Sequence, residues 1–262
     1  MEAPGRAKAW AAWSSGKDSL WALHVARQSG ELEVVGLLTT ITGTYARVSM
    51  HGVREELLEA QARALGLPVH RVLIPAQCSN EEYEAAMDRA VAEARAAGVR
   101  KMIFGDLFLP DVRAYRESRL KGTGIDPDFP LWGRNTAELA REMIAGGVRV
   151  YLTCLDPRKL PREMAGRAFD LSFLNDLPPD VDPCGENGEF HTFAWDGPGF
   201  ARSIEVTVGE TVEREGFVFT DVLPARGKGP GAAGPSQGRS QRHEERVDTS
   251  TTHPLPTGPG AR

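Results

Sequence analysis

The chain has 262 residues, a mass of 28.5 kDa and a formal charge of −5, and these values exclude several classes of protein. Hydrophobic residues make up 41% and charged residues 26%, which is ordinary globular usage and excludes collagen, coiled coil and wholesale disorder. No apolar run approaches the ~18 residues of a membrane-spanning helix, and the acidic balance gives no strong signal for nucleic-acid binding. With three unclustered cysteines and no convincing leader, we expect a reduced, cytoplasmic protein.

Strand and helix patterns alternate along the first 154 residues. Short apolar or β-branched runs predict strands, and apolar positions at helical spacing predict the helices between them. The expected strands lie at residues 9–13, 33–40, 69–74, 99–104 and 148–154. This alternation predicts an α/β fold with a five-stranded, mostly parallel sheet and helices on both faces. Ligands of such sheets bind at the carboxyl ends of the strands.

The remaining residues divide into a cap and a tail. Residues 155–224 are rich in Pro, Gly, Asp and aromatic residues and contain two expected strands, so we interpret them as a small α+β region that caps the sheet. Residues 225–262 hold seven Gly, five Pro and no aromatic residue, and predict a disordered tail. Its six basic and three acidic residues give +3. A tethered partner contact and a solvated extension without function both remain open. The predicted domains are 1–154, 155–224 and 225–262.

The most informative segment joins the first strand to the first helix. It reads Ser14-Ser15-Gly16-Lys17-Asp18-Ser19. Small residues let the backbone approach an anion, the helix start offers unpaired amides, and Lys17 adds a charge for phosphate oxygens. The segment is neither a Walker A loop nor a dinucleotide fingerprint. A serine-capped helix start is the simpler alternative, but capping alone does not need Gly16 and Lys17.

This hexapeptide resembles the S-G-G-K-D-S loop of the ATP pyrophosphatases, with Ser15 in place of the first glycine. The resemblance implies a five-stranded nucleotide-binding domain of the adenine nucleotide alpha hydrolase-like kind. It also implies cleavage of ATP between the α- and β-phosphates. All six loop residues, together with Gly105 after the fourth strand, are then expected to bind ATP.

Three further motifs narrow the family. They are Gly105-Asp106, then Phe129-Pro130-Leu131-Trp132, then the run from Cys184 to Thr192, Cys-Gly-Glu-Asn-Gly-Glu-Phe-His-Thr. Together with the loop they resemble the diphthine–ammonia ligase (diphthamide synthase) family, over residues 8–222 and in the same order. Residues 107–109 and 182–184 look more like the bacterial branch of that family. The resemblance implies that a carboxylate is adenylated with release of pyrophosphate, and that ammonia then gives the amide and AMP.

The last of these motifs places two carboxylates and an imidazole, groups that can act as general acids or bases, within six residues. Glu186, Glu189 and His191 are the expected catalytic residues beside Lys17 and Asp106. If the segment is extended, Glu189 and His191 face the same side. A carboxylate there would hold ammonium or its proton, and His191 would act as a general base near neutral pH. A tight turn with a capping histidine and a solvated glutamate is the alternative.

Further residues are expected to bind the substrate or a metal ion. Asp18 and Asp106 follow neighbouring strands and are the expected Mg²⁺ ligands together with ATP phosphates, although Asp106 alternatively caps the next element. An anionic substrate would suit the arginines after Asp106, since Arg forks match carboxylate and phosphate. The expected substrate-binding residues are Arg116, Trp132, Gly185, Asn187 and Thr192. Trp132 could instead fill the core, and His51 is a further candidate contact.

Two other functions compete with the ligase. Sulfur transfer to a tRNA base needs a cysteine persulfide route or an iron–sulfur site, and the cysteines are not spaced for one. A non-catalytic adenine-nucleotide sensor is supported by the replacement at Ser15. For the ligase, the expected partners are a small-molecule or protein carboxylate and ammonia. The sequence leaves open the carboxylate, the ammonia source and the oligomeric state.

Overall fold

The computed structural model describes residues 5–42, 47–48, 52–75 and 77–225. Within these residues, five parallel strands form the first sheet: β1 (Ala7–Ala12), β2 (Leu32–Thr42), β4 (Val69–Ile74), β5 (Lys101–Ile103) and β6 (Asp126–Asp128). Their spatial order is β4-β2-β1-β5-β6, and the two-residue β3 (Arg47–Val48) pairs antiparallel with β2. The predicted α/β fold with a parallel sheet is confirmed.

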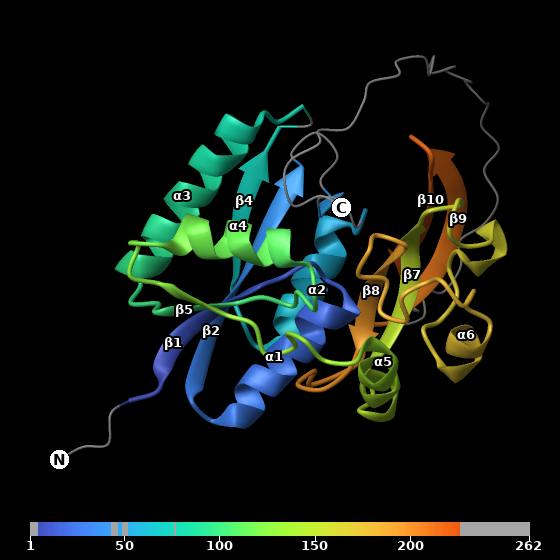
Figure 1. Ribbon diagram of the computed structural model, residues 1–262, viewed down its shortest axis with the longest axis horizontal. Coiled ribbons are helices and arrows are strands. Elements are labelled where there is room, and N and C mark those ends of the chain that lie inside the picture. The colour runs from blue at the N-terminus through green and yellow to red at the C-terminus, as the bar shows by residue number, and fades with distance from the viewer. Residues whose placement is uncertain (1–4, 43–46, 49–51, 76, 226–262) are drawn as a thin grey trace, which may run out of the picture.

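Helices cover both faces of this sheet (Figure 1). On one face lie α1 (Lys17–Ser29) and α2 (Glu55–Leu65), and on the other lie α3 (Asn80–Ala96) and α4 (Pro110–Leu120). The central strand shows why, because successive side chains of a strand point to opposite faces. Ala9 and Ala11 pack in the core with α1 and α2, whereas Trp10 packs in the core with α3.

The helix boundaries follow local signals. Ser79 and Glu82 form a capping box at the start of α3. α1 and α2 end at Gly30 and Gly66, both in the left-handed conformation that glycine adopts without strain. These signals explain why α1, α2 and α3 were predictable.

The C-terminal part forms a separate antiparallel sheet in the order β8-β7-β10-β9. Its elements are α5 (Thr136–Ala145), β7 (Arg149–Leu155), a 3₁₀ turn (Arg162–Met164), α6 (Leu171–Asn175), β8 (Phe190–Asp196), β9 (Val206–Arg214) and β10 (Phe217–Pro224). Figure 1 shows this sheet beside α1 and α2. One apolar core joins them, since Phe193 and Val218 of the sheet share it with Leu20 of α1.

One predicted strand lies in the wrong sheet. A strand does occupy residues 149–155, but β7 pairs antiparallel with β8 and β10 and has no place in the parallel sheet. The fifth parallel strand is β6, whose sequence Asp-Pro-Asp carries no apolar pattern. A domain division after residue 154 would separate β7 from the strands with which it pairs, and that division stays a prediction.

Two expectations fall outside the described residues. They are His51 and, beyond Ala225, the C-terminal tail. Among the residues that are described, no helix has the length and apolar character needed to cross a membrane.

Candidate active site

The predicted phosphate loop lies between β1 and α1 and is approached closely by two other segments. Ser15 has φ 70°, in the left-handed region that non-glycine residues rarely adopt. A Cβ atom at Gly16 would lie 3.1 Å from the Thr192 carbonyl oxygen. A Cβ atom at Gly105 would lie 2.9 Å from the carbonyl carbon of Asp18. A side chain at Gly105 would therefore push the loop away from the end of β5, and one at Gly16 would crowd the start of β8.

Lys17 points into the protein rather than into solvent. Its side chain is 2% exposed, and its Nζ lies 2.8 Å from Asp18 Oδ2 and donates to the Cys184 carbonyl oxygen. The rings of Phe190 and Phe169 lie 5.2 and 5.6 Å from Nζ, within cation–π range. Burial alone would lower the pKa of Lys17, but the neighbouring Asp18 carboxylate raises it, so the ammonium keeps its charge.

The start of α1 receives its cap from a distant segment. Gly16 occupies the N-cap position and offers no side chain. Instead the backbone amide of Lys17 donates to Thr192 Oγ1 at 3.1 Å, across 175 residues of sequence. The Ser14 hydroxyl donates to Ser19 Oγ at 3.2 Å, and the Ser19 hydroxyl donates to the Gly16 carbonyl oxygen at 3.0 Å. The predicted loop residues are thus tied to one another and to β8.

The motif after β5 joins the motif before β8. The Leu107 amide donates to Glu186 Oε1 at 2.7 Å. One residue earlier, the Asp106 carboxylate receives a two-pronged ion pair from Arg116, with Nε–Oδ2 at 2.5 Å and Nη2–Oδ1 at 3.1 Å. The loop, the Gly-Asp motif and the 184–192 segment therefore converge at one place, although they are far apart in the sequence.

Glu189 organises the turn that carries these groups. Its side chain is 1% exposed, and Oε1 accepts hydrogen bonds from the Asp182 amide at 3.2 Å and from Asn187 Nδ2 at 3.1 Å. Gly185 has φ 71°, and a Cβ atom there would lie 2.9 Å from the Phe190 ring. The contacts of Glu189 and Asn187 are thus within the turn, and Glu189 is not the solvated residue of the alternative interpretation.

The surroundings of Glu186 and His191 shift their pKa values in opposite directions. Burial raises the pKa of Glu186 to about 8, with Asp18 and Asp106 adding to the rise. Burial and the Lys17 charge lower the pKa of His191 to about 4. His191 is therefore a neutral imidazole at pH 7, and Glu186 is the group that titrates near neutrality.

Two predicted substrate residues lie at the side of this cluster. Arg116 stacks on Phe104, with its guanidinium carbon 4.6 Å from the ring centre, while its fork holds Asp106. The Trp132 ring packs edge-on against Phe129 at 6.0 Å, and the Arg113 guanidinium lies 4.8 Å from both rings. Trp132 thus belongs to an aromatic–arginine stack rather than to the loop contacts.

The proposed metal ligands are already paired with cations. Asp18 pairs with Lys17, and Asp106 pairs with Arg116. Across the described parts of the chain, no group of three or more His, Cys, Asp or Glu residues is arranged to hold a metal ion.

The three cysteines are buried thiols. Burial raises the pKa of Cys154 to about 12, and it also raises the pKa of Cys184, whose Sγ donates to the Thr136 carbonyl oxygen at 3.4 Å. Since the thiolate is the reactive form, none of these environments activates a cysteine.

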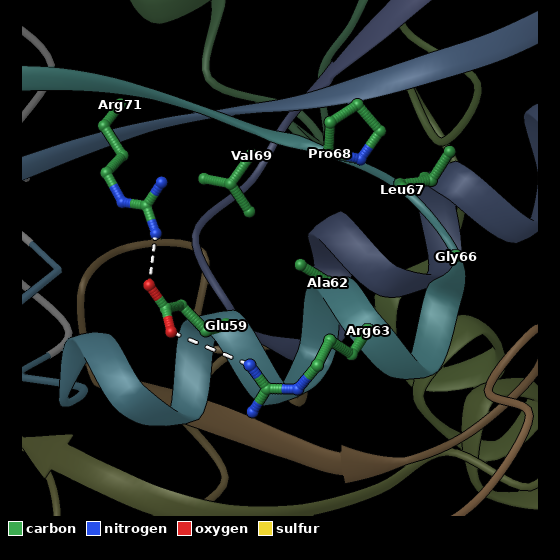
Figure 2. A pocket seen from close by; sticks show the side chains of 8 residues that line it. All are labelled: Glu59, Ala62, Arg63, Gly66, Leu67, Pro68, Val69 and Arg71. Atoms are coloured by element: carbon green, nitrogen blue, oxygen red, sulfur yellow. Dashed lines mark hydrogen bonds and ion pairs between the residues drawn. The ribbon is translucent and has the colours of Figure 1, made fainter.

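Two surface hollows lie away from the cluster. The one in Figure 2 has a volume of about 410 Å³, lies between α2 and β4, and contains an ion-paired Glu59 that contacts both Arg63 and Arg71. The other, of about 840 Å³, lies between α4 and β6. Neither is lined by a predicted site residue.

Two residues of the site escaped the sequence analysis. Gln61 of α2 donates to the Ser15 carbonyl oxygen at 3.0 Å, and Asp182 accepts from the Glu186 amide at 2.9 Å. Gln61 could have been found, because it lies four residues after Leu57 and so stands on the apolar stripe of its helix. For Asp182 no comparable signal exists, since acidic residues are common in loops.

Comparisons with known proteins find relatives along most of the chain. The diphthamide synthase N-terminal domain matches residues 7–126, and the diphthamide synthase C-terminal domain matches residues 135–222. The diphthine–ammonia ligase of Rattus norvegicus is 26% identical over 189 residues, which is 66% of this chain and 71% of the relative. That of Mus musculus is 28% identical over 193 residues, with the same coverage. The two domain matches lie in order and cover most of the sequence, so the chain belongs to the diphthamide synthase family.

Proposed function

We propose that this chain is an ATP-dependent ligase that converts a carboxylate into an amide with ammonia. A carboxylate oxygen attacks the α-phosphorus of ATP, the bond to the bridging oxygen of the β-phosphate breaks, and pyrophosphate leaves. Ammonia then attacks the acyl carbon, AMP leaves, and one proton is released. Because the relatives are named diphthine–ammonia ligases, the carboxylate of diphthine is the first substrate to test.

The convergence of three motifs supports this proposal most strongly. A buried ammonium, a glycine-bearing loop at a helix start and a carboxyl group that titrates near neutrality meet within one cluster. The ammonium and the loop amides suit phosphates and the charge that develops on departing pyrophosphate. Phosphate oxygens would replace the Cys184 carbonyl at Lys17 Nζ and the Thr192 hydroxyl at the Lys17 amide.

Glu186 is proposed to take the proton that ammonia releases. A pKa of about 8 lies close to the working pH, where proton transfer is most effective. His191, neutral at pH 7, would accept or donate a hydrogen bond to the substrate without carrying charge. Glu189 and Asn187 would hold the turn that presents Glu186, and Arg116 would keep Asp106 in place.

Magnesium fits this site together with ATP, whose phosphate oxygens would supply part of its coordination. Mg²⁺ commonly binds one or two carboxylates together with substrate phosphates, and Asp18 and Asp106 are the carboxylates available. Each is held by a cation in the structure, so bound ATP would have to draw Lys17 or Arg116 toward its phosphates first. The ion would then offset phosphate charge.

The test is phosphorus NMR of ATP incubated with magnesium, ammonium, the protein, and either a diphthine-containing acceptor or a host extract. We expect AMP and pyrophosphate from the wild-type chain and at least a hundredfold slower release from Lys17→Met, which keeps the length of the buried side chain. Lys121→Ala, which removes an exposed lysine, is the matched control and should match wild type. ADP with phosphate would contradict the proposed cleavage.

The two competing functions have less support. Sulfur transfer through a cysteine needs a reactive thiolate, but all three thiols are buried and two have strongly raised pKa values. Unchanged AMP release from a triple Cys→Ser variant would exclude that route. ATP that stays bound and intact with ammonium and acceptor present would favour the nucleotide sensor instead.

A further inference from the structure

Gln61 is a fully buried polar residue on an otherwise apolar helix face. Its side chain is 0% exposed, and Leu57, Leu58 and Leu65 of the same helix lie in the surrounding core. An amide buried in such surroundings is unfavourable unless its donors and acceptor are all used. Apolar packing therefore does not explain why a glutamine occupies position 61.

The amide of Gln61 is used completely. Its Oε1 accepts a hydrogen bond from Trp13 Nε1 at 2.9 Å, and its Nε2 donates to the carbonyl oxygens of Ser15 at 3.0 Å and Ala194 at 2.6 Å. The indole can only donate and the two carbonyls can only accept, so these partners fix which end of the amide points where. One side chain thus connects the end of β1, the phosphate loop and β8.

The bond to Ser15 sets the orientation of a peptide plane. The Ser15 carbonyl receives a second hydrogen bond from the Ala194 amide at 2.8 Å, and Ser15 itself has φ 70°. In a trans peptide the carbonyl and the following N–H point in opposite directions. A Ser15 carbonyl held toward Gln61 and β8 therefore directs the Gly16 N–H to the other side, where the Ser14 hydroxyl lies 3.4 Å from the Gly16 nitrogen.

We propose that Gln61 is a positioning residue for the phosphate loop: by holding the Ser15 carbonyl it aims the Gly16 amide at the phosphates of ATP. This role rests on the proposed ATP-dependent function. It assigns to α2 a part in nucleotide binding that involves no contact with the nucleotide. The strained conformation of Ser15 makes the brace necessary, because an unbraced loop would relax away from it.

The experiment compares the affinities of the full chain for Mg·ATP and for adenosine by isothermal titration calorimetry. Gln61→Met keeps the volume and removes all three hydrogen bonds. We expect it to weaken ATP binding at least tenfold and adenosine binding less than twofold, since adenosine has no phosphates to be placed. Gln61→Glu retains the acceptor for Trp13 but lacks the N–H groups, and should act in the same direction.

The matched control is Leu58→Ala, which opens a cavity beside the same helix and removes none of the hydrogen bonds to the loop. Urea unfolding ranks the variants by stability, and Leu58→Ala should leave both affinities within twofold of wild type. ATP affinity in a folded Gln61 variant within threefold of wild type would overturn the positioning role alone. Equal losses for ATP and adenosine, or for Leu58→Ala and Gln61→Met, would also overturn it. A wild-type chain that does not bind ATP would overturn the proposed function and this role together.

Discussion

Ser15 combines two unfavourable features at one position. Its φ of 70° costs a non-glycine residue about 1–2 kcal/mol, and its buried hydroxyl lacks a hydrogen-bond partner, which costs about 1–3 kcal/mol. Glycine would relieve both at an entropic cost of about 0.5–1 kcal/mol. We predict that Ser15→Gly raises the free energy of unfolding by about 1–4 kcal/mol, measured by urea denaturation at constant m-value.

Ser15→Ala separates the two features. It removes the hydroxyl but keeps the side chain that disfavours positive φ, so it should gain less stability than Ser15→Gly. A Ser15→Gly protein less stable than wild type would show that the hydroxyl has a partner of its own in solution.

Glu186 should make stability fall as the pH rises. Its pKa of about 8 in the folded protein lies above its ordinary value of 4.5, so between these values the folded state holds a proton that the unfolded chain releases. The contribution is therefore present below pH 4.5 and is lost as the pH rises to 8. We predict that Glu186→Gln, which keeps an oxygen for the Leu107 amide, flattens this decline by more than about 1 kcal/mol between pH 5 and 8.

His191 supplies an internal control for that measurement. Its pKa of about 4 lies below the ordinary 6.5, so the folded state excludes a proton that the unfolded chain binds. Stability is then lost as the pH falls from 6.5 toward 4, in both wild type and Glu186→Gln. Urea unfolding from pH 4 to 8.5 measures both limbs, and parallel curves for the two proteins above pH 5 would refute the assignment to Glu186.

At the scale of elements, α1 depends on β8 for its cap. Thr192 Oγ1 accepts the Lys17 amide, while Gly16 contributes no side-chain cap. We predict that Thr192→Val, equal in shape but without the hydroxyl, lowers the free energy of unfolding by about 1–2 kcal/mol. Thr192→Ser keeps the hydroxyl and should lose less than half as much in the same urea titration. Equal losses would assign the effect to the Thr192 methyl group instead.

The sequence was sufficient for the elements whose signals are local. Strand β4 and helix α5 begin and end where their apolar patterns predict, and the loop before α1 was recognised from its own residues. Strand β7 shows the limit. Its run of buried residues from Leu152 to Leu155 is typical of a strand in either sheet, and its hydrogen-bond partners lie in β8 and β10. β6 carries no apolar pattern and had no signal.

The candidate site also has a part that the sequence predicts and a part that depends on folding. Lys17 and Gly16 could be named from sequence because their residue types suit phosphate binding, and Glu186 and Gly105 because their motifs resemble those of a known family. The pKa values of Glu186 and His191 could not, since burial and neighbouring charges set them after folding. Neither could the bond from Gln61 to the loop, which depends on how α2 packs.

At the scale of the whole molecule, an ion pair connects a helix that covers the parallel sheet to the antiparallel sheet. Arg54, at the start of α2, forks onto Asp221 of β10 with Nε–Oδ1 at 3.1 Å and Nη2–Oδ2 at 2.5 Å. The pair is partly exposed, so we predict a coupling energy of only about 0.5 kcal/mol between Arg54→Ala and Asp221→Ala. A double-mutant cycle by urea unfolding measures it, and 1 M NaCl should reduce it. A coupling that salt leaves unchanged would contradict this weak, screened interaction.

The cap on α1 also has a consequence for how the protein is made. The Lys17 amide obtains its partner from a residue 175 positions later, and the Ser15 carbonyl obtains one of its donors from Ala194. A nascent chain still on the ribosome before β8 emerges therefore holds the whole parallel sheet but an unfinished loop. Because the Ser15 carbonyl of such a chain lacks its Ala194 donor, we expect tight ATP binding only after β8 is made, and ATP would then selectively stabilise chains that are complete through the second sheet.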